Sequence, residues 1–192
     1  MSDLRVHKTK YINETKRVSF KYDGKNYFGY EGDTLASALL ANGVHLIGRS
    51  FKYHRPRGIM SCGSEEPNAI CQISDKNDLT EPNVRATELE IYDGLEAFSQ
   101  NCWPNVKFDI GGINNLISPL IPAGFYYKTF MWPKSFWKKV YEPLIRMSAG
   151  LGKSPTEPDP DIYDHKYVHY DVLVIGGGSV SYTHLRAHET LN

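Results

Sequence analysis

The feature that most constrains this chain is a hydrophobic run that ends in three glycines, close to the end of its 192 residues: Asp171-Val172-Leu173-Val174-Ile175-Gly176-Gly177-Gly178. A β-branched strand followed by such glycines begins a dinucleotide-binding βαβ unit, because glycine permits a tight turn and a close approach to a pyrophosphate. A complete unit takes about 30 residues and needs a helix, a second strand and an acidic ribose ligand. The chain stops too soon for these parts. We therefore expect only the first strand of a truncated Rossmann-type domain.

The glycines are the candidate cofactor-binding residues. Gly176 and Gly178 match the first two glycines of G-x-G-x-x-G, and Ser181 stands where the third belongs. The structural alternative is a buried strand that ends in a glycine turn. Gly176, Gly177 and Gly178 form the predicted cofactor site, but without a following helix it would lack the amides and dipole that hold a phosphate.

Charge and cysteine usage narrow the class of protein. The chain carries 22 basic and 22 acidic residues, so no general attraction to nucleic acid or to an anionic membrane is expected. The N-terminus has no apolar signal core, and no run approaches the roughly 18 apolar residues of a membrane helix. Three irregularly spaced cysteines suit a reducing compartment. We expect a cytoplasmic protein.

The first part of the sequence predicts a hairpin and then a helix. Residues 18–22 alternate as a half-buried strand, Asp23-Gly24 is a turn, and residues 27–30 form the returning strand. Asp33 is the expected N-cap of a helix over residues 34–42, and Gly43 fits its C′ position. Residues 69–74 and 85–92 are predicted as strands that complete the sheet. This order is typical of a β-grasp domain, the fold of plant-type ferredoxins.

The second half changes character. All three tryptophans fall between residues 93 and 151 among many prolines, so this segment should pack against something larger, with a helix only over residues 135–147. The expected organisation is a loose N-terminus (1–15), the β-grasp domain (16–92), the aromatic and proline-rich segment (93–151), a linker (152–166) and the start of the dinucleotide-binding domain (167–178).

A basic stretch lies in the long loop after the helix. Arg49, Lys52, His54, Arg55 and Arg57 are interleaved with aromatic residues, as in single-strand nucleic-acid sites. Three interpretations stay open: a structural loop held by salt bridges, a contact to a cofactor or subunit, and a nucleic-acid site. The acidic residues that follow and the zero net charge place nucleic acid last.

Metal sites and catalytic centres are not supported. A plant-type cluster needs four cysteines in a C-x4-C-x2-C…C arrangement, which Cys62, Cys71 and Cys102 do not supply. His184 and His188 have the spacing of a helical zinc pair, as do His165 and His169, but neither pair has a third ligand. No Ser-His-Asp, paired-carboxylate or Cys-His arrangement is present.

Several long blocks resemble the α subunits of heterotetrameric sarcosine oxidases. The resemblance covers about residues 16–178, and its blocks are Gly32–Gly43, Gly48–Gly58, Gly63–Asn68, Pro122–Pro133 and Tyr141–Arg146. It implies an α+β fold with an N-terminal β-grasp domain, like a 2Fe-2S ferredoxin but without the cluster. A dinucleotide-binding domain and a folate-binding domain would follow.

The resemblance also implies a function. The α subunit would bind NAD at the glycine run, with FAD as the alternative, and would assemble with β, γ and δ subunits. The β subunit would carry FMN and FAD and oxidise sarcosine to glycine, with the one-carbon unit passed to tetrahydrofolate and hydrogen peroxide formed. The chain alone is expected to be inactive.

The sequence leaves two other functions open and ends in an unusual tail. The alternatives are the α subunit of a related FAD-dependent amine or amino-acid dehydrogenase, and a β-grasp assembly module without a ligand. Residues 179–192 depart from the family, which continues with Pro-Ala-Gly after the glycines. This tail resembles translated sequencing-adapter read-through, and we expect it to be non-native.

Overall fold

A computed structural model describes residues 4–5, 10–74, 80–120, 124, 130–158, 162–176 and 178–189. The chain divides into two units, Met1–Glu157 and Pro158–Asn192, each described by itself below. The strands of the first unit are β1 (Asn13–Tyr22), β2 (Lys25–Glu31), β3 (Gly48–Arg49), β4 (Pro56–Arg57), β5 (Ile70–Ser74), β6 (Thr80–Arg85) and β7 (Leu95–Ser99). Its helical elements are α1 (Leu35–Ala41), η1 (Ile110–Gly112), α2 (Ile113–Leu116), η2 (Ser118–Leu120), η3 (Lys134–Phe136), η4 (Trp137–Tyr141) and α4 (Glu142–Ser148).

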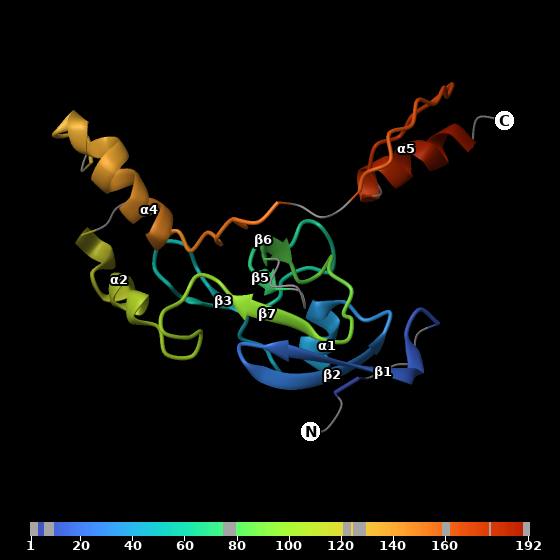
Figure 1. The fold of residues 1–192 in the computed structure, drawn as a ribbon, viewed down its shortest axis with the longest axis horizontal. Coiled ribbons are helices and arrows are strands. Elements are labelled where there is room, and N and C mark those ends of the chain that lie inside the picture. The colour runs from blue at the N-terminus through green and yellow to red at the C-terminus, as the bar shows by residue number, and fades with distance from the viewer. Residues whose placement is uncertain are drawn as a thin grey trace. The chain divides into compact units, whose positions relative to one another are not determined.

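The predicted hairpin is present as β1 and β2 (Figure 1). Asp23 and Gly24 both have positive φ angles, 47° and 74°, as a two-residue turn that follows the twist of the strands requires. Along β1, every second side chain from Val18 to Tyr22 is buried. The alternation read from the sequence is therefore confirmed.

The sheet has five strands in the order β2-β1-β7-β5-β6. β7 pairs parallel with β1 and antiparallel with β5. This mixed sheet with its helix fits the predicted α+β fold. Its central strand β7 lies beyond residue 92, the predicted limit of the domain.

The predicted strand over residues 85–92 is wrong. The chain leaves the sheet at Ala86, whose N–H donates to Ala69 O, and the Glu88 N–H then closes a turn onto Arg85 O. The sheet is completed by β6 and β7 instead. The strands β6 and β7, which residues 86–94 connect, thus replace the single strand expected over residues 85–92.

Helix α1 begins one residue later than predicted. Thr34 is its N-cap, because the Thr34 side chain accepts a hydrogen bond from the Ser37 N–H. Asp33, the expected cap, is fully buried and instead accepts from the Ser37 hydroxyl, the Tyr30 N–H and the Arg5 guanidinium. Gly43 follows the helix with φ = 73°, as predicted for its C′ position.

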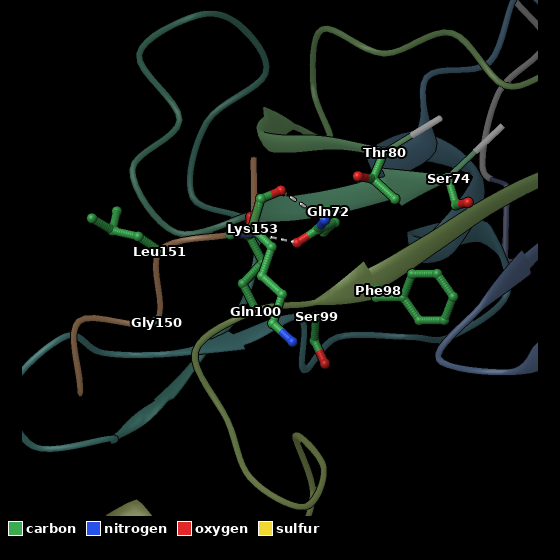
Figure 2. A pocket seen from close by; sticks show the side chains of 10 residues that line it. Gln72, Ser74, Thr80, Phe98, Ser99, Gln100, Gly150, Leu151 and Lys153 are labelled. Carbon is green, nitrogen blue, oxygen red and sulfur yellow. Dashed lines mark hydrogen bonds between the residues drawn. The ribbon is translucent and has the colours of Figure 1, made fainter. Parts of the chain in front are cut away.

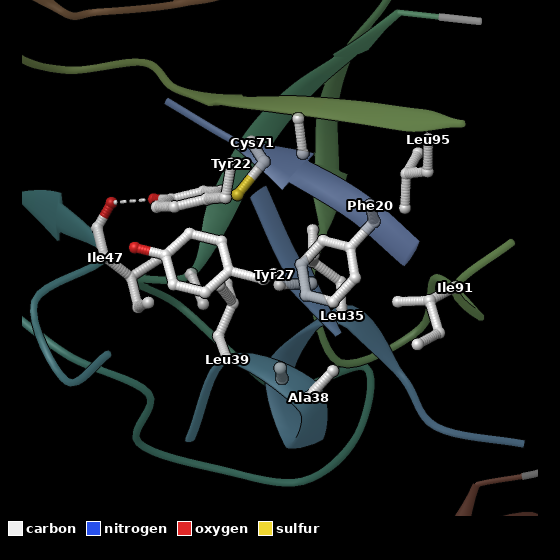
Figure 3. Packing of buried hydrophobic residues seen from close by; sticks show 14 of the residues in the cluster. Phe20, Tyr22, Tyr27, Leu35, Ala38, Leu39, Ile47, Cys71, Ile91 and Leu95 are labelled. Atoms are coloured by element: carbon white, nitrogen blue, oxygen red, sulfur yellow. Dashed lines mark hydrogen bonds between the residues drawn. The ribbon is translucent and has the colours of Figure 1, made fainter. Parts of the chain in front are cut away.

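The core lies between α1 and the sheet, as Figure 3 shows. Phe20 stacks on Tyr27 with ring centroids 5.9 Å apart, over Leu35 and Leu39 of the helix. The Tyr22 hydroxyl is buried with its polar end satisfied, since it donates to Ile47 O at 2.9 Å. Burial of these side chains is the main driving force for the fold.

In the described part of the aromatic segment that follows the sheet, most large apolar side chains are exposed. The predicted helix over residues 135–147 is formed, but as three successive pieces: the 3-10 turn η3, the π-helix η4 and α4. Pro143 lies in the first turn of α4 and has no N–H to continue the regular ladder. Trp103 and Trp132 are 68% and 83% exposed, so their predicted packing partner is not supplied by the described residues. Residues 125–127, part of the predicted aromatic cluster, lie outside those residues.

Candidate functional site

The loop before β5 is built around one buried carboxylate. Glu66 is 1% exposed. Its Oε2 accepts from the N–H groups of Met60 and Ser61 at 2.7 and 2.6 Å, and its Oε1 accepts from those of Asn68 and Ala69 at 2.7 and 3.1 Å. The Glu66 side chain thereby links residues 60–61 on one side of the loop to residues 68–69 on the other.

Burial and hydrogen bonding act on Glu66 in opposite directions. Burial raises its pKa, whereas the four backbone donors lower it, and the net result is a pKa below the ordinary glutamate value. The Thr87 hydroxyl donates to Gly63 O and ties the outer end of the loop to the turn after β6. Glu66 was not singled out from the sequence, where it is one of two adjacent glutamates in a polar loop.

The three cysteines lie in different surroundings. Cys62 is exposed in this loop, whereas Cys71 is buried in the core on β5. Burial raises the pKa of the Cys71 thiol to about 12 and also raises that of Cys102, which lies 3.2 Å from the Ser99 hydroxyl. Cys71 and Cys102 therefore favour the neutral thiol over the thiolate that binds metals.

Hydrogen bonds join the basic loop to the segment that follows β7. Arg49 donates from Nε to Val106 O at 2.7 Å and from Nη2 to Lys107 O at 2.9 Å. Arg55 Nε donates to the amide oxygen of Asn115 at 2.8 Å. These cations bind neutral oxygens rather than the carboxylates of the predicted salt bridges.

His54 also contacts the segment that follows β7. Its Nδ1 lies 2.7 Å from Asp109 Oδ2, and Asp109 Oδ1 accepts from the N–H groups of Trp103 and Gly111. A Cβ on Gly111 would lie 2.3 Å from the His54 ring, so only glycine allows this approach. The geometry favours the structural interpretation of the basic loop, and a contact to a cofactor or subunit stays a prediction.

A shallow pocket of about 390 Å³ opens beside the sheet (Figure 2). It lies between β5, β6, β7 and residues 150–153, where Lys153 exchanges two hydrogen bonds with the Gln72 side chain. Lys153 is the one charged side chain in its described lining. These contacts hold the returning segment against the sheet.

The glycine run does not form the predicted strand. In the second unit, residues 162–176 have no regular secondary structure, and Ile175 is 87% exposed. A strand of this kind needs neighbours on both sides, and none lies among the described residues of this unit.

A helix does follow the glycines, contrary to expectation: α5, Ser179–Glu189, begins directly after Gly178. Gly176 has φ = 105°, which favours glycine, whereas Gly178 has open space around it, and Gly177 lies outside the described residues. Whether these glycines bind a cofactor stays a prediction.

Both histidine pairs fall in the second unit of the chain. His165 and His169 are exposed, and His184 and His188 fall within α5. No group of three or more potential metal-binding side chains occurs in the part of the chain that the structure describes. That part also contains no helix long and apolar enough to cross a membrane.

Comparison with known proteins gives this geometry a context. A family model described as a 2Fe-2S iron-sulfur cluster binding domain matches residues 15–102. The sarcosine oxidase subunit alpha of Rhizobium meliloti (strain 1021) is 56% identical over 178 residues, or 93% of this chain. The chain is homologous to sarcosine oxidase α subunits. The resemblance read from the sequence blocks is thus confirmed.

Two further sarcosine oxidase α subunits, from Corynebacterium sp. strains U-96 and P-1, are 31% and 32% identical over 169 residues. The chain spans 18% of the Rhizobium subunit and 12% of each Corynebacterium subunit. Among solved structures, L-proline dehydrogenase from P. horikoshii aligns with 49% of this chain and 17% of that one. The two chains are 23% identical over the aligned region, with a TM-score of 0.37.

The residues of the matched domain do not fit a plant-type 2Fe-2S cluster. A C-x4-C-x2-C series that began at Cys62 would need cysteines at Pro67 and Ile70. A series that ended at Cys71 would need them at Gly63 and Asn68. Either register leaves a single thiol, and in the second register that thiol is the core residue Cys71.

Proposed function

We propose that this chain is the N-terminal part of the α subunit of a sarcosine oxidase. The observation that carries the proposal is the 56% identity to the Rhizobium α subunit over 93% of the chain. The proposed whole enzyme oxidises sarcosine to glycine, transfers the one-carbon unit to tetrahydrofolate and produces hydrogen peroxide. Flavins on the β subunit would supply the two-electron oxidation when bound.

In this proposal the first unit contributes structure rather than chemistry. Trp103, Trp132 and Trp137 are exposed in the segment that follows the sheet. We propose that this segment is covered by the rest of the subunit or by its β, γ and δ partners. Many exposed apolar side chains in one segment are typical of an interaction surface. The glycine run would open the dinucleotide-binding domain and hold NAD, with FAD as the alternative.

The test is the activity of the complete α subunit produced with its β, γ and δ partners. We expect sarcosine-dependent oxygen consumption, hydrogen peroxide formation and formation of methylene-tetrahydrofolate when folate is supplied. Deletion of residues 1–157 from the complete subunit should prevent assembly, as measured by size-exclusion chromatography. Oxidation of another amine or amino acid, with no activity toward sarcosine, would favour the related dehydrogenase. If the subunits assemble but oxidise neither sarcosine nor another amine or amino acid, the result would favour the assembly module without a ligand.

The 192-residue chain alone should bind NAD poorly or not at all. Residues 172–175 are exposed and unpaired as strands, so the glycines after them are not held against a sheet. Isothermal calorimetry of the purified chain with NAD should show no saturable heat. Micromolar affinity would contradict this prediction, and the complete subunit is the positive control.

A further inference from the structure

The loop of residues 58–69 has the donor pattern of an anion cradle. Four main-chain N–H groups converge on the Glu66 carboxylate, two on each oxygen. Within the described part of the chain, these four N–H groups are the hydrogen-bond partners of the carboxylate. Backbone amides that converge on one point form a typical anion-binding concavity.

An iron–sulfur cluster makes similar demands on a loop. Its thiolate-ligated core is anionic, and hydrogen bonds to its sulfurs tune it. This chain matches a cluster-binding domain over residues 15–102 but lacks the cysteines, so inward-facing amides would otherwise be left without an acceptor. Main-chain N–H groups that point into a loop are costly to leave without an acceptor, so an anion at this point stabilises the loop.

We propose that the Glu66 carboxylate takes the place of the cluster as the anion that organises this loop. The β-grasp domain thereby keeps its loop closed without iron and carries no electrons. The inference goes beyond the proposed function, because it concerns this domain alone and holds whichever substrate the complete enzyme oxidises.

Neighbouring contacts support a structural role for the carboxylate. Glu66 lies between the two limbs of the loop, and its own N–H donates to Gly63 O at 3.1 Å. Ala69 O accepts from Ala86 N–H, which links the closed loop to the sheet where β6 ends. Loss of the carboxylate charge should therefore loosen residues 60–69 and leave the hairpin β1–β2 unaffected.

The experiment compares the full chain with the variants Glu66→Gln and Glu65→Gln. Glu65 is the exposed neighbour, so its replacement is a matched control. Hydrogen exchange is measured at the amides of Met60, Ser61, Asn68 and Ala69. In Glu66→Gln we expect exchange at these amides to be at least about tenfold faster, because an amide group must present a donor to two of the four N–H groups. Glu65→Gln should match the parent.

A second experiment tests whether an iron–sulfur cluster can be assembled in the chain. The parent chain and both variants are incubated anaerobically with ferrous iron, sulfide and thiol, then desalted and assayed for iron, sulfide and visible absorption. We expect no stoichiometric cluster in any of them. A cluster in the parent chain, or unchanged amide protection in Glu66→Gln, would overturn the proposal.

If Glu66→Gln does not fold, pH decides the question in the parent chain. The pKa of Glu66 is lowered by the fold, so its charge persists below the ordinary glutamate pKa of about 4.3 and is lost only as the pH falls further. Protection of the four loop amides, corrected for intrinsic exchange, should then fall before that of β1 and β2. Loss of both together, or retention of the loop protection, would contradict the proposal.

Discussion

Replacing Asp33 with asparagine should lower the free energy of unfolding by about 3–5 kcal/mol, the usual cost of breaking a buried ion pair. The Asp33 carboxylate is fully buried and pairs with the Arg5 guanidinium. It also accepts from Tyr30 N–H at 2.9 Å and the Ser37 hydroxyl at 2.8 Å. Asparagine would leave the Arg5 charge without its counter-ion and turn one acceptor into a donor. Urea unfolding followed by far-ultraviolet circular dichroism measures the loss.

The matched control for this prediction is the exposed pair between Lys16 and Glu31. Glu31→Gln removes the same kind of charge from the end of β2, two residues before Asp33. Because water screens exposed pairs, the midpoint of unfolding should hardly change. Equal effects of the two substitutions would show that the Arg5–Asp33 pair contributes no more than a surface pair.

Replacing Phe20 with alanine should lower the free energy of unfolding by about 3–5 kcal/mol, through lost burial and the cavity that remains. Phe20 is 2% exposed and lies at the centre of the core between β1 and α1. The neighbouring rings and leucines belong to a sheet and a helix, which can collapse only partly into the space. The same urea titration gives the value.

Phe28 provides the control for Phe20. It lies on the adjacent strand β2, opposite Ser19 in the register, and is 45% exposed on the other face of the sheet. Phe28→Ala loses mainly the contact with the Arg17 guanidinium, 3.9 Å from the ring centroid, and should cost under about 1 kcal/mol. A loss at Phe28 as large as at Phe20 would contradict the assignment of the two faces.

The first hairpin and α1 could be predicted because their signals are local. Alternation along β1, the Asp23-Gly24 turn and the glycine after the helix each need only a few neighbouring residues. The predictions were wrong where contacts between residues far apart in the sequence determine the structure. Asp33 and Thr34 are both good caps in sequence, and Arg5 determines that Asp33 turns inward. β7 was missed because its place in the sheet depends on pairing with β1, more than 70 residues earlier.

The candidate site likewise has local features, which could be predicted from the sequence, and long-range contacts, which could not. Cysteine spacing was enough to argue against a plant-type cluster, because that site has a fixed local pattern. The role of Glu66 could not be read, since it depends on the amides of Met60 and Ala69 folding back onto one side chain. The Asp109–His54 contact likewise joins residues 55 positions apart. The predicted strand over residues 171–175 lacks the neighbours that would stabilise it among the described residues.

The tryptophans lie where their fluorescence responds to the binding of a partner. Trp103, Trp132 and Trp137 are 68%, 83% and 46% exposed, and the core cluster of the sheet contains no tryptophan. Their emission should therefore be red-shifted and open to quenching by acrylamide while the β-grasp core is intact, and should change little when that core melts. Association with a partner that covers the aromatic segment should move the emission to the blue. Tryptophan fluorescence in this chain thus reports assembly, whereas circular dichroism reports folding.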